Sequence, residues 1–178
     1  MESGFTTRPF GTTGLSVGAL GLGSSFGLPA KEVERAFDRG VNFFLWGSLR
    51  KNDFGVGLRN LAPQHREDMV VAIQSYTRFA SLMEWSVNRA LRFMKTDYVD
   101  VLCLAWWNGP PPPRIIDAAL ALREKGKIRS VVVSCHHQRG RRSVGTKMFL
   151  DDCRVRRVLS SACPSDPACS AYSIADNP

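Results

Sequence analysis

The sequence predicts an α/β protein built around a parallel sheet. Between Val41 and Ser134, short runs of apolar and β-branched residues alternate with longer segments of helical period. This alternation is typical of repeated βα units, and runs that are apolar throughout indicate strands covered on both faces. The periodic region follows a turn-rich amino-terminal segment and ends near Gly140, where the pattern is lost.

The predicted strands are short, apolar and bounded by turn-forming residues. They lie near Gly18–Gly21, Val41–Phe44, Met69–Ile73, Val99–Leu104 and Arg129–Ser134. Ahead of them, the turn signals in Phe10–Gly14 predict that Thr6–Val17 folds as a small hairpin.

Helices are predicted where apolar residues recur on one stripe with a period near 3.6 residues. The three segments are Lys31–Arg39, Ala80–Met94 and Ile115–Glu124. Gly40 and Gly126 follow two of them, and glycine is favoured just past a helix end because it adopts a left-handed backbone readily. Pro113 precedes the third, where its fixed φ suits the first helical turn.

The composition is that of a soluble globular protein. The chain has 178 residues, of which 44% are hydrophobic and 22% charged, enough for one domain with a sizeable core. No stretch approaches the roughly 20 apolar residues of a membrane span, and the first residues lack the pattern of a signal peptide. We therefore expect a cytoplasmic protein without a membrane partner.

The net charge of +8 is concentrated late in the chain. Arg139–Arg157 holds seven basic residues and two acidic ones, and a basic binding module is one alternative function. Such a module would bind with strong salt dependence. The segment lacks a pattern of interleaved aromatic residues, with Phe149 alone among its basic residues, and it has no known reader motif, so nucleic acid is not the expected partner.

The five cysteines do not form a Cys-x-x-Cys pair, so we expect neither a zinc site nor a redox pair. Cys135-His136-His137 is interpreted as a strand end followed by a polar loop, because neighbouring residues on a strand point to opposite faces.

A set of short motifs carries a family resemblance. The motifs are Arg8–Val17, Leu20–Gly23, Gly40–Phe44, Arg66–Ala72, Lys95–Leu102 and Gly126–Ser134. In this order and at these spacings they resemble the amino-terminal part of the aldo/keto reductases, over about Thr6 to His137. The resemblance implies a TIM (β/α)8 barrel and an ancestry in NADP(H)-dependent oxidoreductases that reduce aldehydes and ketones.

We accordingly expect a partial TIM barrel of about five βα units with an amino-terminal hairpin. Residues 1–140 would form the aldo/keto-reductase-like part, and 141–178 a divergent tail, basic and then rich in Ser, Pro and Cys, that is poorly ordered. A complete barrel needs about 250 residues, so the chain is expected to be truncated. A frameshifted reading frame would also give a tail of this kind. Open sheet edges would then favour self-association.

The resemblance also implies a catalytic Asp, Tyr, Lys and His at the carboxyl ends of early strands. The matching positions here are Leu45, Arg50, Gln74 and Ala105, so none of the four is intact. Leucine cannot polarise a lysine, glutamine carries no charge, and an arginine with a pKa above about 12 is a poor proton donor. We therefore expect a pseudoenzyme with weak or no carbonyl reduction.

A ligand pocket is expected at the same strand ends. Trp46, Arg50, Trp106 and Trp107 would line it and hold a small molecule, although loop packing also explains the tryptophans. The main alternative is an active, divergent NADPH-dependent aldehyde or ketone reductase that uses Arg50, with Lys51 beside it. The alternative interpretation is that both basic residues are solvated and belong to a loop without a function in catalysis.

Cofactor binding is expected to be weak or absent. Ser134 matches the serine of the family's Ser-Asn pair at the nicotinamide, Cys135 departs from it, and Gln74 is a weak further candidate. The family's clamp on the adenosine phosphate follows the seventh and eighth strands, which have no counterpart in the sequence.

Overall fold

The computed structural model describes residues 5–47, 53–107, 110–135 and 147–150. The strands are β1 Thr7–Pro9, β2 Ser16–Gly18, β3 Gly21–Gly23, β4 Phe43–Trp46, β5 Val70–Ser75, β6 Val99–Leu104, β7 Ile128–Cys135 and β8 Lys147–Leu150. The helices are α1 Ala30–Asp38, α2 Asp53–His65, α3 Ala80–Met94 and α4 Pro113–Glu124, with 3-10 turns η1 Ser24–Phe26 and η2 Arg66–Asp68.

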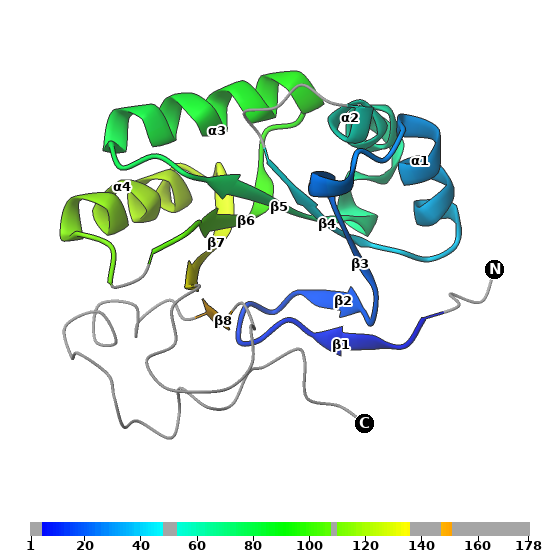
Figure 1. The fold of residues 1–178 in the computed structure, drawn as a ribbon, viewed down its shortest axis with the longest axis horizontal. Coiled ribbons are helices and arrows are strands. Elements are labelled where there is room, and N and C mark those ends of the chain that lie inside the picture. Colours follow the sequence, from blue (N-terminus) through cyan, green and yellow to red (C-terminus); the bar gives the residue numbers. More distant parts are fainter. Residues whose placement is uncertain (1–4, 48–52, 108–109, 136–146, 151–178) are drawn as a thin grey trace.

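The main sheet has the order β3-β4-β5-β6-β7-β8. Its first five strands are parallel, and β8 pairs with β7 in the antiparallel direction. Each parallel pair is joined by a helical crossover, and α1 to α4 lie together along one side of the sheet (Figure 1). The predicted α/β class, with about five βα units, is confirmed.

The amino-terminal hairpin is also confirmed. β1 and β2 pair antiparallel with Arg8 opposite Val17, and the hairpin lies on the side of the sheet away from the helices (Figure 1). Phe10 reaches the sheet, where its ring lies 5.2 Å from that of Phe43. The Asn42 carboxamide ties the hairpin to β4 by accepting from the Gly18 amide at 2.8 Å.

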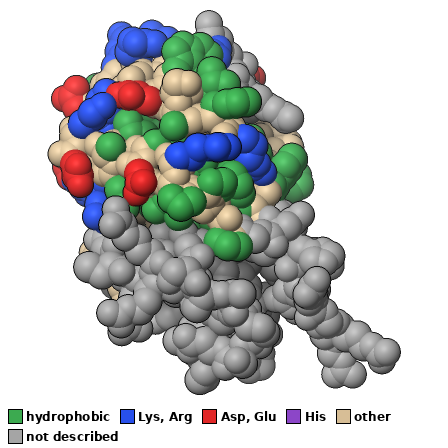
Figure 2. All heavy atoms as spheres, turned by 90° about the vertical axis from the view of Figure 1, so that its left-hand side faces the viewer, with side chains coloured by type: hydrophobic (Ala, Val, Ile, Leu, Met, Phe, Trp, Pro, Cys, Tyr) green, Lys and Arg blue, Asp and Glu red, His purple; other side chains and the backbone are tan. Residues whose placement is uncertain are grey.

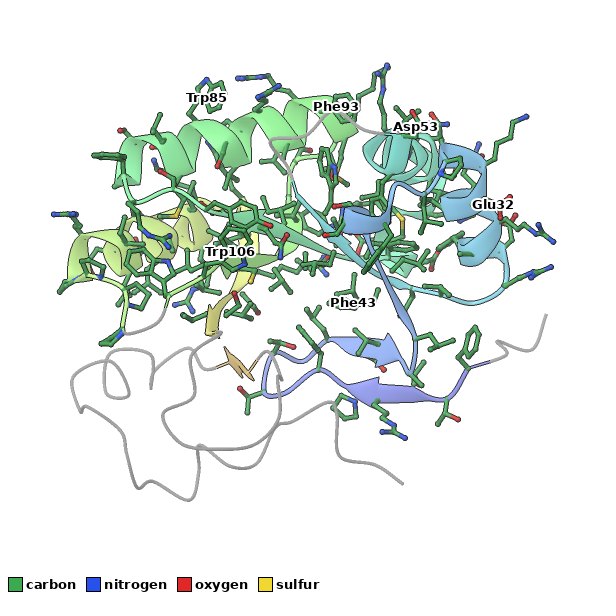
Figure 3. The ribbon with its side chains drawn as sticks, in the orientation of Figure 1. Glu32, Phe43, Asp53, Trp85, Phe93 and Trp106 are labelled. Carbon is green, nitrogen blue, oxygen red and sulfur yellow. The ribbon has the colours of Figure 1, made fainter. Side chains whose placement is uncertain are left out.

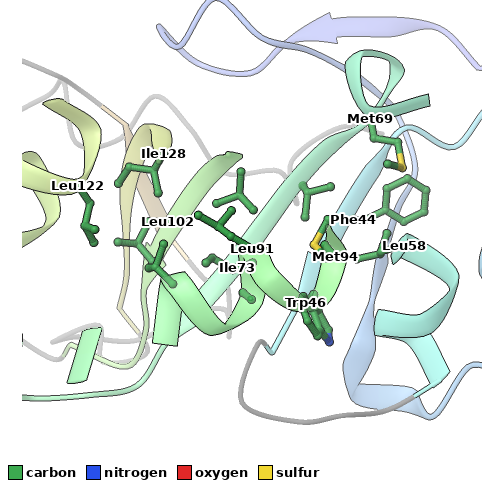
Figure 4. Packing of buried hydrophobic residues seen from close by; sticks show 14 of the residues in the cluster. Phe44, Trp46, Leu58, Met69, Ile73, Leu91, Met94, Leu102, Leu122 and Ile128 are labelled. Carbon is green, nitrogen blue, oxygen red and sulfur yellow. The ribbon is translucent and has the colours of Figure 1, made fainter. Parts of the chain in front are cut away.

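The sheet has an apolar layer on each face, because successive strand residues point to opposite sides. On the helix side, Phe44, Ile73 and Leu102 pack against the four helices (Figure 4). On the hairpin side, Ala72 and Val101 pack with Phe10. This double coverage explains why the strands are apolar throughout.

The first predicted strand is wrong in its position. β2 ends at Gly18 and β3 begins at Gly21, so the predicted Gly18–Gly21 is the connection between them. Leu20 in this connection is 54% exposed. The run of small and apolar residues did not distinguish two short strands from one, because periodicity carries little information over three residues.

Helix α2 is absent from the helices predicted by sequence. It contains Gly55, Gly57 and Pro63, which lower helix propensity. The glycines allow close packing: a Cβ on Gly57 would lie 2.8 Å from the Val33 Cβ and 2.9 Å from the Ala30 carbonyl oxygen, both on α1. The short distance between α1 and α2 therefore requires glycine, which is a tertiary reason that local propensity does not contain.

We expect Gly57→Ala to destabilise the protein. A gain in helix propensity of at most ~1 kcal/mol is outweighed by an overpacking cost of about 1–3 kcal/mol, since the nearest atoms are a backbone oxygen and a Cβ. Urea unfolding should show a net loss of about 1–2 kcal/mol. Gly23→Ala is the matched control, because no atom lies within 4 Å of its added Cβ. Equal effects of the two substitutions would contradict the packing explanation.

The other helices follow their predicted limits closely. Ala80–Met94 is helical over its predicted range, and Pro113 begins α4. Gly40 and Gly126 have φ of 94° and 69°, as expected past a helix end. No helix in the described ranges is long and apolar enough to cross a membrane.

Part of the predicted tail covers one of the sheet edges that were expected to be open. β8 lies within 141–178 and pairs Phe149 with Val133, so the end of β7 has a neighbour. The rest of the predicted divergent tail, 141–146 and 151–178, lies outside the described residues, as does most of the basic segment Arg139–Arg157.

Candidate active site

The carboxyl ends of the parallel strands meet at one end of the sheet, where active sites of barrel folds lie. The backbone holds these ends in register: the Ala105 amide donates to the Ser75 carbonyl at 2.9 Å, and the Trp107 amide to the Ser134 carbonyl at 3.0 Å. The Gly47 amide donates to Ser24 Oγ at 3.0 Å and so links the chain beyond β3 to that beyond β4. We call this region the mouth.

Three of the four positions that are expected from the sequence to match the family's catalytic residues lie at the mouth. Leu45 is half-buried in the apolar layer on the hairpin side. Gln74 is at the end of β5, where its Oε1 accepts a hydrogen bond from the Tyr76 hydroxyl. Ala105 is fully buried directly after β6. Arg50, the fourth position, and its neighbour Lys51 lie outside the described residues.

This arrangement has no acid–base pair among its described members. A leucine and an alanine cannot exchange protons, and the glutamine amide, which accepts the tyrosine hydroxyl, is not an acid or base at neutral pH. Tyr76 is the phenol described at the mouth, and no lysine or carboxylate takes part in its bond to Gln74. The described mouth can offer hydrogen bonds to a ligand, and its described residues include no lysine–carboxylate pair that would activate a phenol as proton donor.

The prediction that Trp46 lines the pocket is wrong. Trp46 is 1% exposed and lies on the helix side of β4, the same side as Phe44 two residues earlier. Its ring packs on Gly55, where an added Cβ would lie 2.6 Å from the Trp46 Cζ2, and on Phe93 at a centroid distance of 5.5 Å. Strand alternation directs Leu45 to the hairpin side of the sheet, so Trp46, the next residue, points to the helix side.

The other two tryptophans differ from each other. Trp106 is 59% exposed, and its ring meets the Tyr76 ring edge-on at 4.9 Å, so it does border the mouth (Figure 3). Trp107 packs partly into the core on the helix side, which agrees with the loop-packing interpretation. Only Trp106 among the predicted pocket residues is therefore described at the mouth with an exposed ring.

Trp106 has a φ of 59°, in the left-handed region that bulky residues rarely adopt. Arg78 stabilises this turn, donating to the Ala105 carbonyl at 3.3 Å and to the Trp106 carbonyl at 2.8 Å. The same guanidinium lies 4.0 Å from the centre of the Trp107 ring. Sequence reasoning missed Arg78, since nothing local indicates which carbonyls an arginine after a strand will reach.

Cys103 lies just below the mouth on the hairpin side and is 2% exposed. Burial raises the pKa of its thiol from 9.0 to about 11, and hydrogen bonds from Ser134 oppose the shift only weakly. The thiol is therefore protonated at neutral pH and is not a nucleophile.

The raised pKa of Cys103 predicts a loss of stability in alkali. The contribution is complete below the unfolded pKa near 9 and is lost as pH rises through the folded value of about 11. The loss should reach about 2–3 kcal/mol. It is measured as the difference between the pH profiles of the unmutated chain and Cys103→Ala. In the folded protein at pH 8, iodoacetamide should leave Cys103 unmodified by peptide mass spectrometry; rapid modification would contradict the burial.

Ser134 is the candidate for contact with a nicotinamide. It is 3% exposed, its Oγ accepts from the Trp106 amide at 3.1 Å, and its hydroxyl also hydrogen-bonds to the Cys103 thiol. These bonds use the hydroxyl within the protein. The other candidate, Gln74, is bonded to Tyr76. The Ser134 hydroxyl and the Gln74 carboxamide oxygen are therefore already engaged in this arrangement and do not fit the role of holding a nicotinamide.

The described residues contain no cluster of three or more His, Cys, Asp or Glu side chains that could hold a metal ion. The sequence-based expectation of no zinc site concerned the whole chain, and the remaining cysteines have no described side chains.

Known proteins and solved structures are similar to part of this chain. The chain is 34% identical to L-galactose dehydrogenase of Arabidopsis thaliana, over 53% of this chain and 36% of that protein. A putative aldo-keto reductase from Pseudomonas aeruginosa superposes with a TM-score of 0.62 at 23% identity, covering 72% of this chain and 59% of that one. This chain is similar to part of an aldo/keto reductase.

A thermostable aldo-keto reductase solved with the inhibitor epalrestat gives a TM-score of 0.58 at 21% identity, over 72% of this chain and 53% of that chain. No protein-family model matches the sequence. The predicted resemblance is thus confirmed for part of the chain, and the partial barrel fold with it. The chain spans about a third of the curated relative's length and somewhat more than half that of the solved structures.

Proposed function

We propose that this chain is an aldo/keto-reductase-like pseudoenzyme, which has the scaffold of NADP(H)-dependent oxidoreductases but does not reduce carbonyls by the family's acid–base mechanism. The proposal rests on the residues found at the mouth. Leu45, Gln74 and Ala105 occupy three positions of the expected catalytic set, and none can donate a proton or lower the pKa of one that does.

Weak or absent NADP(H) binding is part of the proposal. The family's cofactors supply hydride when bound, and a usable site must present free hydrogen-bonding groups to the nicotinamide amide. Ser134 and Gln74 are committed to bonds within the protein. What remains at the mouth is a small-molecule surface made by the rings of Trp106 and Tyr76.

The test is titration of NADPH into the full chain, followed by nicotinamide and tryptophan fluorescence, together with an assay of NADPH oxidation on a panel of aldehydes. We expect no saturable binding below millimolar cofactor and no turnover above background. Micromolar binding with turnover would overturn the proposal.

The second candidate is an active, divergent oxidoreductase, favoured by the 34% identity to a protein named for sugar dehydrogenation. Here Arg50 would act on the substrate oxygen as an electrostatic group. The same assays, run in both directions with aldehydes and with aldose sugars, separate the two functions. Turnover abolished by Arg50→Ala and retained in Lys51→Ala would establish this candidate.

A further inference from the structure

A hollow of about 420 Å³ lies on the helix side of the sheet, between the end of β5 and the first turns of α3. Its lining residues are Ser75, Tyr76, Thr77, Arg78, Phe79, Leu82, Trp85 and Ser86. Figure 2 views the side of the molecule on which α3 begins and shows hydrophobic and basic side chains next to each other there. The volume is that of a small-molecule site.

The walls of the hollow are apolar side chains that the fold leaves exposed. Phe79 is 65% exposed, and Leu82 and Trp85, which follow at helical spacing, are each 49% exposed. Trp85 stands on the outer side of α3, away from the sheet (Figure 3). Three large apolar residues exposed together indicate a surface that another molecule covers.

Ser75 is a polar group at the base of this hollow. Its side chain is 3% exposed, and its hydroxyl has no hydrogen-bond partner among the described residues. A buried hydroxyl without a partner costs about 1–3 kcal/mol, so buried polar groups are nearly always bonded. A ligand oxygen in the hollow would supply the missing bond.

The surroundings of Ser75 favour a negative ligand. α3 begins with no side-chain cap and no acidic residue in its first turn, so the positive end of its dipole is not neutralised by its own side chains. The exposed side chain of Arg78, which also donates to the Ala105 and Trp106 carbonyls, lines the hollow, and none of the described lining residues is acidic. Glu84, the nearest carboxylate along α3, is paired with Lys125 at 2.9 Å.

We propose that this hollow binds a small carboxylic acid with an aromatic or branched aliphatic body. The body lies against Phe79, Leu82 and Trp85, and the carboxylate accepts hydrogen bonds from the Ser75 hydroxyl near the start of α3 and from Arg78. The hollow adjoins the mouth through Tyr76 and Arg78, but its buried anchor Ser75 points to the face of β5 opposite to Gln74. It does not depend on the proposed loss of carbonyl reduction.

The experiment is titration of the full chain with phenylacetate, followed by NMR of the Trp85 indole and the Leu82 methyl groups. We expect saturable shifts of both signals. Phenylacetamide, the neutral analogue, should bind at least about tenfold more weakly, because it lacks the charge. Acetate, which lacks the apolar body, should leave the Leu82 methyl signals unchanged.

Ser75→Ala is the decisive variant, since removing an unpartnered hydroxyl should leave folding intact. We expect it to weaken phenylacetate binding about five- to tenfold while the thermal midpoint stays the same or rises. Ser81→Ala makes the same chemical change at an exposed position of α3 and should bind normally. The proposal is overturned if phenylacetate does not bind, if phenylacetamide binds as tightly, or if Ser75→Ala and Ser81→Ala bind equally.

Discussion

Trp46→Ala should lower the free energy of unfolding by about 4 kcal/mol, the cost of removing a large buried aromatic side chain from a packed core. Trp46 is 1% exposed and fills the space between β4, Gly55 on α2 and Phe93 on α3. Glycine at position 55 leaves no side chain to close the resulting cavity. Chemical denaturation followed by circular dichroism measures the loss.

Two controls separate a core role for Trp46 from a pocket role. Trp46→Phe keeps an aromatic ring and removes an indole N–H that has no hydrogen-bond partner among the described residues, so it should cost about 1 kcal/mol. Trp85→Ala removes a half-exposed tryptophan and should cost less than about 1 kcal/mol. If Trp46→Ala instead left stability unchanged and altered ligand binding at the mouth, the core assignment would be wrong.

Asp100→Ala should cost about 3–5 kcal/mol, because it breaks a buried ion pair and leaves its partners unpaired. Asp100 is 1% exposed at the amino end of β6. Its Oδ2 accepts from Arg66 Nη2 at 2.7 Å and from the Val71 amide at 2.8 Å, and Arg129 Nη1 lies 3.3 Å from Oδ1. Because the pair is buried, high salt should reduce the cost only slightly.

The neighbouring charges provide matched comparisons for Asp100. Arg66→Ala leaves the buried carboxylate without its closest cation and should cost nearly as much as Asp100→Ala. Arg129 is 45% exposed, so Arg129→Ala should cost about 1 kcal/mol or less. Urea unfolding of the three variants tests this order. Equal losses for Arg66→Ala and Arg129→Ala would show that burial does not determine the effect.

Tyr98 packs against the two arginines that pair with Asp100, and the position of this cluster suits a role in stability and not in catalysis. Both guanidiniums lie against its ring, Arg66 at 4.0 Å and Arg129 at 4.2 Å from the centroid. Burial, and a hydrogen bond to Glu67 at 2.5 Å, raise the pKa of the Tyr98 phenol. The cluster lies at the amino ends of β5 and β6, opposite the mouth, where residues of barrel folds serve stability.

Local signals in the sequence were sufficient for much of the fold. The apolar stripe of Ala80–Met94 predicted α3, and Pro113 and Gly126 predicted where α4 begins and ends. Both predictions succeeded because caps and periodicity act within a few residues. The order of the motifs predicted the partial barrel, because motif order and spacing are properties of the sequence itself. The replacement of the catalytic positions, read from the same motifs, stays a prediction.

Tertiary structure decided the features that depend on distant partners. Gly55 and Gly57 stand inside helix α2, despite their low helix propensity, because Trp46 and α1 approach these positions too closely for a Cβ. Trp46 lies in the core, and not in the predicted pocket, because strand alternation and packing against Phe93 place it there. The Ser75 hydroxyl has no partner among the described residues, and Arg78 reaches two loop carbonyls. Both features follow from contacts between segments that are separate in sequence, which periodicity and motif spacing do not encode.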